Sequence, residues 1–132
     1  MLFRANDYMI TIVELRSFQA DADGIFTEKE RDDLTDFIAA NPHFGDVIPG
    51  TGGVRKIRWG AGASGKRGGA RVIYYFRDLN IPVFLLAVYK KGEKMNLTMA
   101  ERDQMRRLVD HLVNEYQARR WANIVTLGKS PA

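Results

Sequence analysis

Several residue types that support catalysis or stabilise small folds are scarce in this sequence or missing from it. There is no cysteine, there are two histidines, and no apolar run approaches the roughly 20 residues that a membrane-spanning helix needs. Without cysteine the chain has no disulfide framework, no thiolate metal site and no cysteine nucleophile, which agrees with a reducing compartment. The amino terminus also lacks a basic stretch followed by a signal-type apolar core. We therefore expect a cytoplasmic protein with no membrane association.

The histidines and carboxylates do not form a pattern that predicts catalysis. His43 follows the helix-ending pair Asn41-Pro42, and His111 lies off the apolar stripe of the last predicted helix. We expect both imidazoles to be solvated rather than to act as general bases or ligands. The carboxylates lie mostly at capping and surface positions of two predicted helices, which argues against a paired-acid hydrolase. The sequence thus predicts no metal site and no cofactor.

The composition is that of an ordinary globular chain, but its charge is unevenly distributed. Hydrophobic residues make up 45% and charged residues 27% of the 132 residues, which suits a single core. We expect one domain over residues 1–121 and a C-terminal tail over residues 122–132. Residues 1–53 carry a net charge of −6, residues 54–94 of +8 and residues 95–132 of +2. The local positive field favours a polyanionic partner.

Capping and periodicity signals predict an α+β fold. Thr27 and Thr98 are each followed by Glu three positions later, which is the capping-box pattern that opens a helix. Apolar residues after Thr98 recur at spacings of three and four, which predicts a long helix packed on a sheet. Between the helices, apolar runs separated by turn residues predict an antiparallel meander. The expected elements are a strand over Tyr8–Leu15, a short helix over 17–23, a helix from Thr27 to Asn41, a loop over 45–53, strands over 54–59, 70–77 and 81–90, and a helix from Thr98 that fades after Trp121.

Cations and aromatic residues alternate on the three strands of the meander. Side chains alternate between the faces of a strand, so Lys56 and Arg58 share a face of the first strand, and Tyr89 and Lys91 share a face at the end of the third. If those faces coincide with the face of Arg71 on the middle strand, they form one basic surface suited to nucleic acid. The alternative is that these cations are simply the solvated side of an antiparallel sheet.

The loop between the first two meander strands resembles a phosphate-binding P-loop but departs from it twice. Gly60 to Lys66 fits most of the pattern, but Arg67 stands where Ser or Thr should hold magnesium. Gly68 and the residue after it lead into a strand, where a P-loop leads into a helix. The sequence therefore argues against a nucleotide triphosphatase. Lys66 and Arg67 are expected either to grip a nucleic-acid phosphate at the rim of the basic surface or to belong to a plain hairpin loop.

Two strings of residues form a recognisable pattern. The first is Gly45 to Arg58, and the second is Gly65 to Phe76, with its Gly-Lys-Arg-Gly-Gly and Ile-Tyr-Tyr-Phe motifs; Leu97-Thr98 follows later. Together they resemble the HigB branch of the RelE superfamily of bacterial toxins. The resemblance covers about residues 5–117. It implies a RelE-like twisted antiparallel sheet with two helices before the meander and one after it.

The resemblance also implies a function and a set of site residues. It implies a cytoplasmic mRNA endoribonuclease that acts on translating ribosomes, leaves a 2′,3′-cyclic phosphate, and is held inactive by a cognate antitoxin protein. The catalytic residues it implies are Lys56, Arg58, Arg71 and Lys91, and further RNA contacts are expected from Lys66, Arg67, Tyr89 and Lys90. RelE-type toxins often add a catalytic tyrosine near the C-terminus, but here Tyr116 falls on the apolar helix stripe and is expected in the core.

Two other functions remain open at this point. A ParE-like toxin on the same scaffold would inhibit DNA gyrase by binding protein, although the strand cations Lys56, Arg58 and Arg71 argue against it. A non-catalytic RNA-binding module would bind RNA with a strong salt dependence but would not cleave it.

Overall fold

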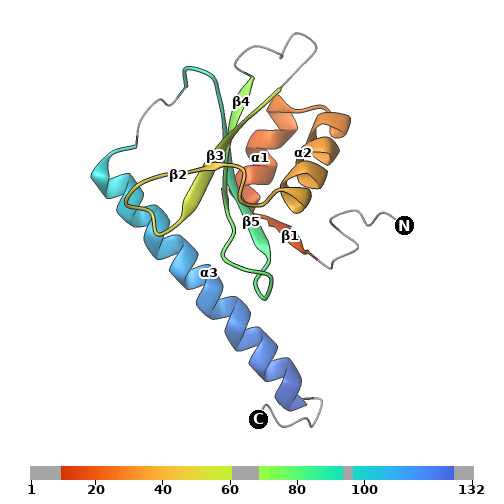
Figure 1. Ribbon diagram of the computed structural model, residues 1–132, viewed down its shortest axis with the longest axis vertical. Coiled ribbons are helices and arrows are strands. Elements are labelled where there is room, and N and C mark those ends of the chain that lie inside the picture. The colour runs from red at the N-terminus through yellow and green to blue at the C-terminus, as the bar shows by residue number, and fades with distance from the viewer. Residues whose placement is uncertain (1–9, 61–68, 94–96, 127–132) are drawn as a thin grey trace.

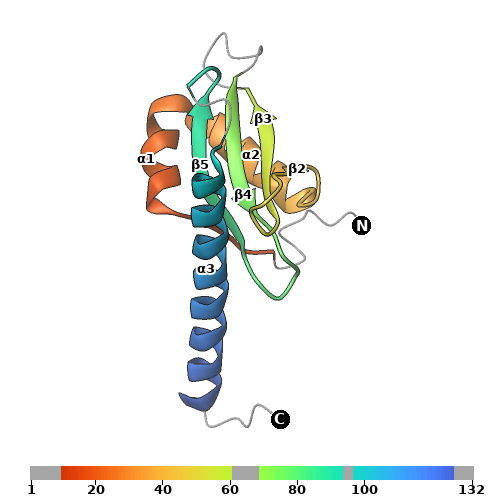
Figure 2. The ribbon, with the colours of Figure 1, turned by 90° about the vertical axis from the view of Figure 1, so that its left-hand side faces the viewer.

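The computed structural model describes residues 10–60, 69–93 and 97–126, with side chains through residue 120. In chain order the elements are β1 (Ile12–Glu14), α1 (Arg16–Ile25), α2 (Glu28–Ala40), β2 (Asp46–Val47), β3 (Val54–Trp59), β4 (Ala70–Tyr75), β5 (Val83–Lys90) and α3 (Met99–Thr126). They form an α+β fold in which a five-stranded sheet has α1 and α2 on one face and α3 on the other (Figure 1). The helix α3 crosses its face and continues beyond the sheet (Figure 2).

The sheet is mixed, so the expectation of a wholly antiparallel sheet was wrong. Its strand order is β1-β5-β4-β3-β2, with antiparallel pairing from β5 to β2 and parallel pairing of β1 with β5. The backbone of Leu15 donates to the carbonyl of Leu85 over 3.0 Å, and that of Val83 donates to the carbonyl of Thr11 over 2.9 Å. A parallel neighbour requires a long crossover connection, and α1 and α2 begin that connection here. The residue types of a segment predict that it forms a strand, but not whether that strand pairs with its neighbour in a parallel or an antiparallel direction.

Two apolar clusters hold the helices to the sheet, one on each face. Successive side chains of a strand point to opposite faces, so β4 contributes Val72 and Tyr74 to one cluster and Ile73 and Tyr75 to the other. The cluster beneath α1 and α2 includes Phe18, Leu34, Ile38, Val72, Tyr74, Val83 and Leu85. The cluster beneath α3 includes Val54, Ile73, Tyr75, Phe84, Leu86, Val109 and Val113. Burying both faces in this way accounts for the largely apolar composition of β4 and β5.

The sequence signals of α2 are confirmed. The hydroxyl of Thr27 accepts a hydrogen bond from the backbone of Glu30 over 3.1 Å, and the Glu30 carboxylate accepts one from the backbone of Thr27 over 2.8 Å. This reciprocal pair is the predicted capping box, and it satisfies amide groups that the first turn of a helix leaves without partners. Leu34 and Ile38 are fully buried, whereas Phe37 is only partly buried.

Several boundaries differ from the prediction. The helix α1 passes through Gly24 and is longer than expected, because an exposed glycine weakens a helix without having to end it. The strand β4 ends at Tyr75, earlier than expected, and α3 continues to Thr126, beyond the limit predicted near Trp121. Leu108 belongs to the apolar residues of α3 that recur at spacings of three and four, but it is 39% exposed because the helix turns it toward solvent.

The two edge strands were the elements predicted least well. β1 spans Ile12–Glu14, and the first residues of the predicted strand, Tyr8 and Met9, lie outside the described residues. β2 spans Asp46–Val47, inside the stretch 45–53 that was expected to be a loop. A two-residue strand is too short to show an alternating pattern in the sequence. It is therefore recognised only from its hydrogen bonds to β3 in the folded structure.

Carboxylates of the acidic first part of the chain act as structural ion-pair partners. Arg31 on α2 contacts Glu14 on β1 at 2.8 Å and Asp23 on α1 at 2.6 Å. The side chains of Arg31 and Glu14 are each 23% exposed, so water screens this pair less than a surface pair. The hydrogen bond to Glu14 is the main cause of the raised pKa of Arg31. These contacts connect β1, α1 and α2. Glu14 and Asp23 therefore have a structural role as partners of Arg31.

Candidate functional site

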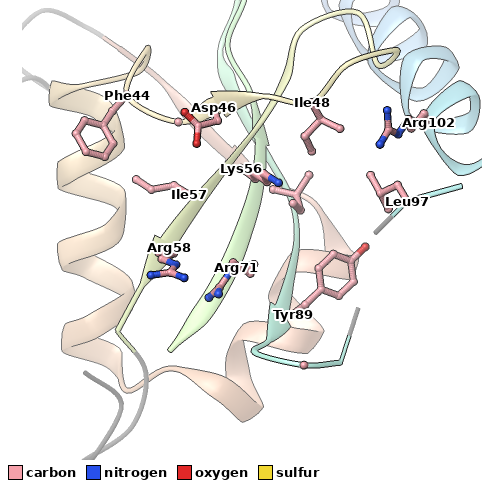
Figure 3. Close-up of a pocket in the computed structure, with 13 residues that line it drawn as sticks. Phe44, Asp46, Ile48, Lys56, Ile57, Arg58, Arg71, Tyr89, Leu97 and Arg102 are labelled. Carbon is pink, nitrogen blue, oxygen red and sulfur yellow. The ribbon is translucent and has the colours of Figure 1, made fainter. Parts of the chain in front are cut away.

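A cavity of about 620 Å³ opens on the sheet face that carries α3. It lies over β3, β4 and the end of β5, beside the beginning of α3 (Figure 3). Its described lining consists of Phe44, Gly45, Asp46, Ile48, Lys56, Ile57, Arg58, Arg71, Ile73, Tyr89, Gly92, Leu97 and Arg102.

The pairing of β3 with β4 brings the strand cations into this cavity. Arg58 lies opposite Arg71, and Lys56 lies opposite Ile73, so all of these side chains share one face of the sheet. The parity prediction for these cations is therefore confirmed. At the other end of the same face Val54 is fully buried in the cluster beneath α3. One end of the β3–β4 pair thus belongs to the core, while the end that carries the cations is accessible to solvent. Lys56 and Arg58 are exposed there, and Arg71 is half-buried.

The third strand places its candidate residues on different sides. Tyr89 lies opposite Arg71 and lines the cavity, where its ring also packs against the cluster beneath α3. Lys90 lies opposite Ala70, whose side chain is buried beneath α1 and α2, so Lys90 is directed to the other face. Lys91 follows the end of β5 and is exposed in a turn.

The residues singled out from the sequence therefore separate into groups. Neither Lys90 nor Lys91 is among the described residues that line the cavity. The loop residues Lys66 and Arg67 lie outside the described part of the chain. The candidates that the structure brings together are Lys56, Arg58, Arg71 and Tyr89.

Groups on the opposite face of the sheet hold the rim of the cavity in place. The Tyr74 hydroxyl accepts a hydrogen bond from the backbone of Gly45 and donates one to the carbonyl of Pro42, both over 2.9 Å. The Arg55 guanidinium donates to the carbonyls of His43 and Gly45 over 3.0 and 2.7 Å. Burial raises the pKa of Tyr74, so its hydroxyl stays protonated and able to donate. The segment leading into β2 is therefore fixed by residues that do not line the cavity.

Sequence reasoning missed several lining residues. Arg102 reaches the cavity from the first turns of α3, where its guanidinium donates to the carbonyl of Pro49 over 3.2 Å. A cation near the start of a helix lies at the positive end of the helix dipole, which is unfavourable. The position of Arg102 in the sequence was therefore a signal that its side chain has a role outside the helix. Phe44, Asp46 and Leu97 were also missed, because only the fold brings them next to the strand cations.

The cavity has a strong excess of positive charge. Lys56, Arg58, Arg71 and Arg102 line it, and Asp46 is the one carboxylate among its described lining residues. Asp46 lies opposite Lys56 in the pairing of β2 with β3, so it is placed at the rim. Guanidinium groups bind phosphate oxygens in bidentate fashion, and several fixed cations around one space favour a group that carries charge on several oxygens. The arrangement can therefore bind a phosphodiester and stabilise additional charge on its phosphorus-bound oxygens.

Aromatic residues outside the cavity have structural roles. The indole of Trp59 donates to the carbonyl of Glu30 over 3.0 Å and packs against the core beneath α1 and α2. The side chain of Trp121 lies outside the described part of the structure. Tyr116 packs against the other core, as predicted from its place on the helix stripe. His43 and His111 are both exposed.

No protein-family model matches the sequence. In the described ranges, no group of three or more His, Asp or Glu side chains is placed to hold a metal ion. No helix in the described part of the chain is long and apolar enough to cross a membrane.

Proposed function

We propose that this chain is the toxin of a RelE/HigB-type toxin–antitoxin pair and that it cleaves messenger RNA. The observation that carries the proposal is the meeting of Lys56, Arg58 and Arg71 in one cavity through the pairing of β3 with β4. Several fixed cations around one space favour an anionic substrate that carries charge on several oxygens.

The proposed reaction is the transfer of the phosphoryl group from the 5′-oxygen of one nucleotide to the 2′-oxygen of the preceding one. The ribose 2′-hydroxyl loses its proton and forms a bond to phosphorus, while the bond from phosphorus to the 5′-oxygen breaks. The products are a 2′,3′-cyclic phosphate and a 5′-hydroxyl, which takes up a proton. Arg58 and Arg71 would stabilise the charge that develops on the phosphoryl oxygens. Lys56 would hold the backbone or assist proton transfer.

The proposed catalytic group differs from the one that the resemblance implies. Lys91 was expected among the catalytic residues, but Arg58 is the direct cross-strand neighbour of Arg71 and lines the same cavity. We therefore assign the phosphoryl group to Arg58 and Arg71. Lys90 and Lys91 would contact RNA only outside the cavity.

The partners follow from the same charge distribution. The substrate would be mRNA, positioned on translating ribosomes in the cytoplasm. The inhibitory partner would be an antitoxin with an acidic segment that covers the cations of the cavity, because such a segment competes directly with the phosphate backbone.

A cell-free translation reaction with one labelled reporter mRNA tests the proposal. The proteins to compare are the wild type, Arg71→Ala, and the control Lys29→Ala, which removes a cation that is 83% exposed on α2. We expect the wild type and Lys29→Ala to cut the reporter at discrete sites and to leave 2′,3′-cyclic phosphate ends. Arg71→Ala should cut at least 100-fold more slowly, as expected when one preorganised donor is removed.

The outcomes separate the proposal from its alternatives. Salt-dependent binding of the reporter without cleavage would indicate a non-catalytic RNA-binding module. Intact RNA together with inhibited DNA gyrase would indicate a ParE-like toxin. Equal cleavage by the wild type and Arg71→Ala would remove Arg71 from the mechanism.

A further inference from the structure

Phe44 is an exposed aromatic ring at the rim of the basic cavity. Its side chain is 65% exposed, which is unusual for a phenylalanine that lies next to a core. Figure 3 shows the ring on the α2 side of the cavity, across from Tyr89. Phe44 lines the same cavity as Lys56 and Arg58. A solvent-facing ring beside phosphate-binding cations is the combination found where single-stranded nucleic acids bind.

The ring is held in a fixed position. The Phe37 ring contacts Phe44 edge to face with centroids 5.1 Å apart, and Phe37 in turn contacts Trp59 at 5.3 Å. The backbone of Phe44 donates to the carbonyl of Asn41 over 3.0 Å. The hydrogen bonds from Arg55 and Tyr74 described above fix the residues on either side of it. One side of the ring is therefore supported by the protein, while most of its surface is available to a ligand.

We infer that Phe44 is a stacking platform for a nucleobase of the RNA whose phosphate binds Arg58 and Arg71. This inference rests on the proposed function and adds a base-contacting residue to the same site. Every base has an aromatic face, so the contact would hold one nucleotide beside the cavity without reading its sequence. The rigid ring loses little conformational entropy when the base stacks, because its neighbours already restrict it.

Equilibrium binding of a short single-stranded RNA tests the inference. The probe is a fluorescein-labelled decanucleotide with 2′-O-methyl groups, which cannot undergo the proposed cleavage, read by anisotropy at several salt concentrations. The variants are Phe44→Ala, Phe44→Trp, Arg58→Ala and the control Leu79→Ala, which shortens a side chain that is 75% exposed outside the cavity.

The stacking contribution has a signature that differs from that of a charge. Phe44→Ala should bind roughly tenfold more weakly than the wild type, and Phe44→Trp should restore binding. The salt dependence of Phe44→Ala should equal that of the wild type, whereas Arg58→Ala should reduce the slope by about 0.7. Leu79→Ala should bind like the wild type. A probe with abasic positions should bind the wild type more weakly than the intact probe does. The Phe44→Ala variant should bind the two probes with nearly equal affinity, because it lacks the ring on which a base would stack.

Two results would overturn the inference, and they are distinguishable. If Arg58→Ala weakens binding and Phe44→Ala does not, the RNA site stands and Phe44 is not its stacking platform. If the wild type does not bind the probe even at low salt, the stacking platform fails, whereas the proposed function fails only if the reporter mRNA also stays intact in cell-free translation.

Discussion

Arg58 on β3 and Arg71 on β4 lie directly opposite each other, and both line the same cavity (Figure 3). Facing residues of a ladder have closely spaced side chains, and like charges in such a pair repel. The pairing of β3 with β4 therefore holds two guanidinium groups close together on one side of the cavity. Their proposed role is to provide a preformed site for the oxygens of a phosphodiester.

The first prediction concerns the stability cost of this pair. Arg58→Gln removes one charge and keeps a polar side chain, and we expect it to raise the free energy of unfolding by about 0.5 kcal/mol at low salt. Urea denaturation at low and high ionic strength measures the effect, which should shrink at high salt because screening already weakens the repulsion. Arg58→Lys keeps the charge and serves as the control. A variant Arg58→Gln that is less stable than the wild type at low salt would show that the pair is not repulsive.

The second prediction concerns the glycine at the cavity rim. A β-carbon at Gly45 would lie 2.7 Å from the Tyr74 hydroxyl and 2.9 Å from the carbonyl oxygen of Lys56, closer than packed atoms approach. Gly45→Ala should therefore lower the free energy of unfolding by about 1–3 kcal/mol. Gly24→Ala is the matched control, because a β-carbon there meets nothing within 4 Å. At this exposed position of α1 the alanine should stabilise the protein by about 0.5–1 kcal/mol.

Equal effects of the two alanine substitutions would contradict this description of the rim. Urea denaturation of both variants against the wild type is sufficient to decide. The Gly45→Ala variant should also cleave RNA more slowly, because the segment that carries Asp46 and Phe44 is displaced from the cations.

The third prediction concerns alkaline pH. Burial raises the pKa of Tyr74, so the native state keeps this proton at a pH where the unfolded chain loses it. The resulting stability is fully present below the unfolded pKa of about 10 and is lost as the pH rises through the native pKa. The free energy of unfolding of the wild type should therefore fall above about pH 10. That of the Tyr74→Phe variant should fall less steeply. Tyr75, whose pKa is also raised by burial, accounts for part of the slope that remains.

The fourth prediction separates the cavity residues from the lysines after β5. Lys91→Ala and Lys90→Ala should retain cleavage within a few-fold of the wild type, because neither residue is among the described residues that line the cavity. Arg58→Ala should lose at least 100-fold in the cleavage rate, as for one preorganised transition-state donor. Reporter cleavage in cell-free translation provides the comparison. A loss with Lys91→Ala as large as that with Arg58→Ala would return Lys91 to the catalytic group.

Much of the fold could be predicted where local signals are strong. The capping box at Thr27 placed the start of α2, and alternation along β3 predicted the shared face of Lys56 and Arg58. Both signals depend on neighbours in the sequence. They are therefore visible before the tertiary structure is known.

The remainder depends on contacts between distant parts of the chain. The parallel pairing of β1 with β5 follows from the path of the crossover, which no residue in β1 encodes. Phe44 and Asp46 join the site because Tyr74 and Arg55 fix the segment before β3 through hydrogen bonds to its backbone. Arg102 joins it because α3 packs across the sheet. Such residues have no spacing relationship to the strand cations.

Mapping of RNA 5′ ends across the transcriptome of cells that express the chain tests most directly whether the basic cavity cleaves RNA. Brief induction of the wild type or of Lys29→Ala should produce new 5′-hydroxyl ends at discrete positions within translated messages. Induction of Arg71→Ala at equal protein level should produce none. Two results would contradict the assignment of this basic cavity as an RNA-cleaving site. One is that the wild type produces no new 5′ ends, and the other is that Arg71→Ala produces as many of them as the wild type does.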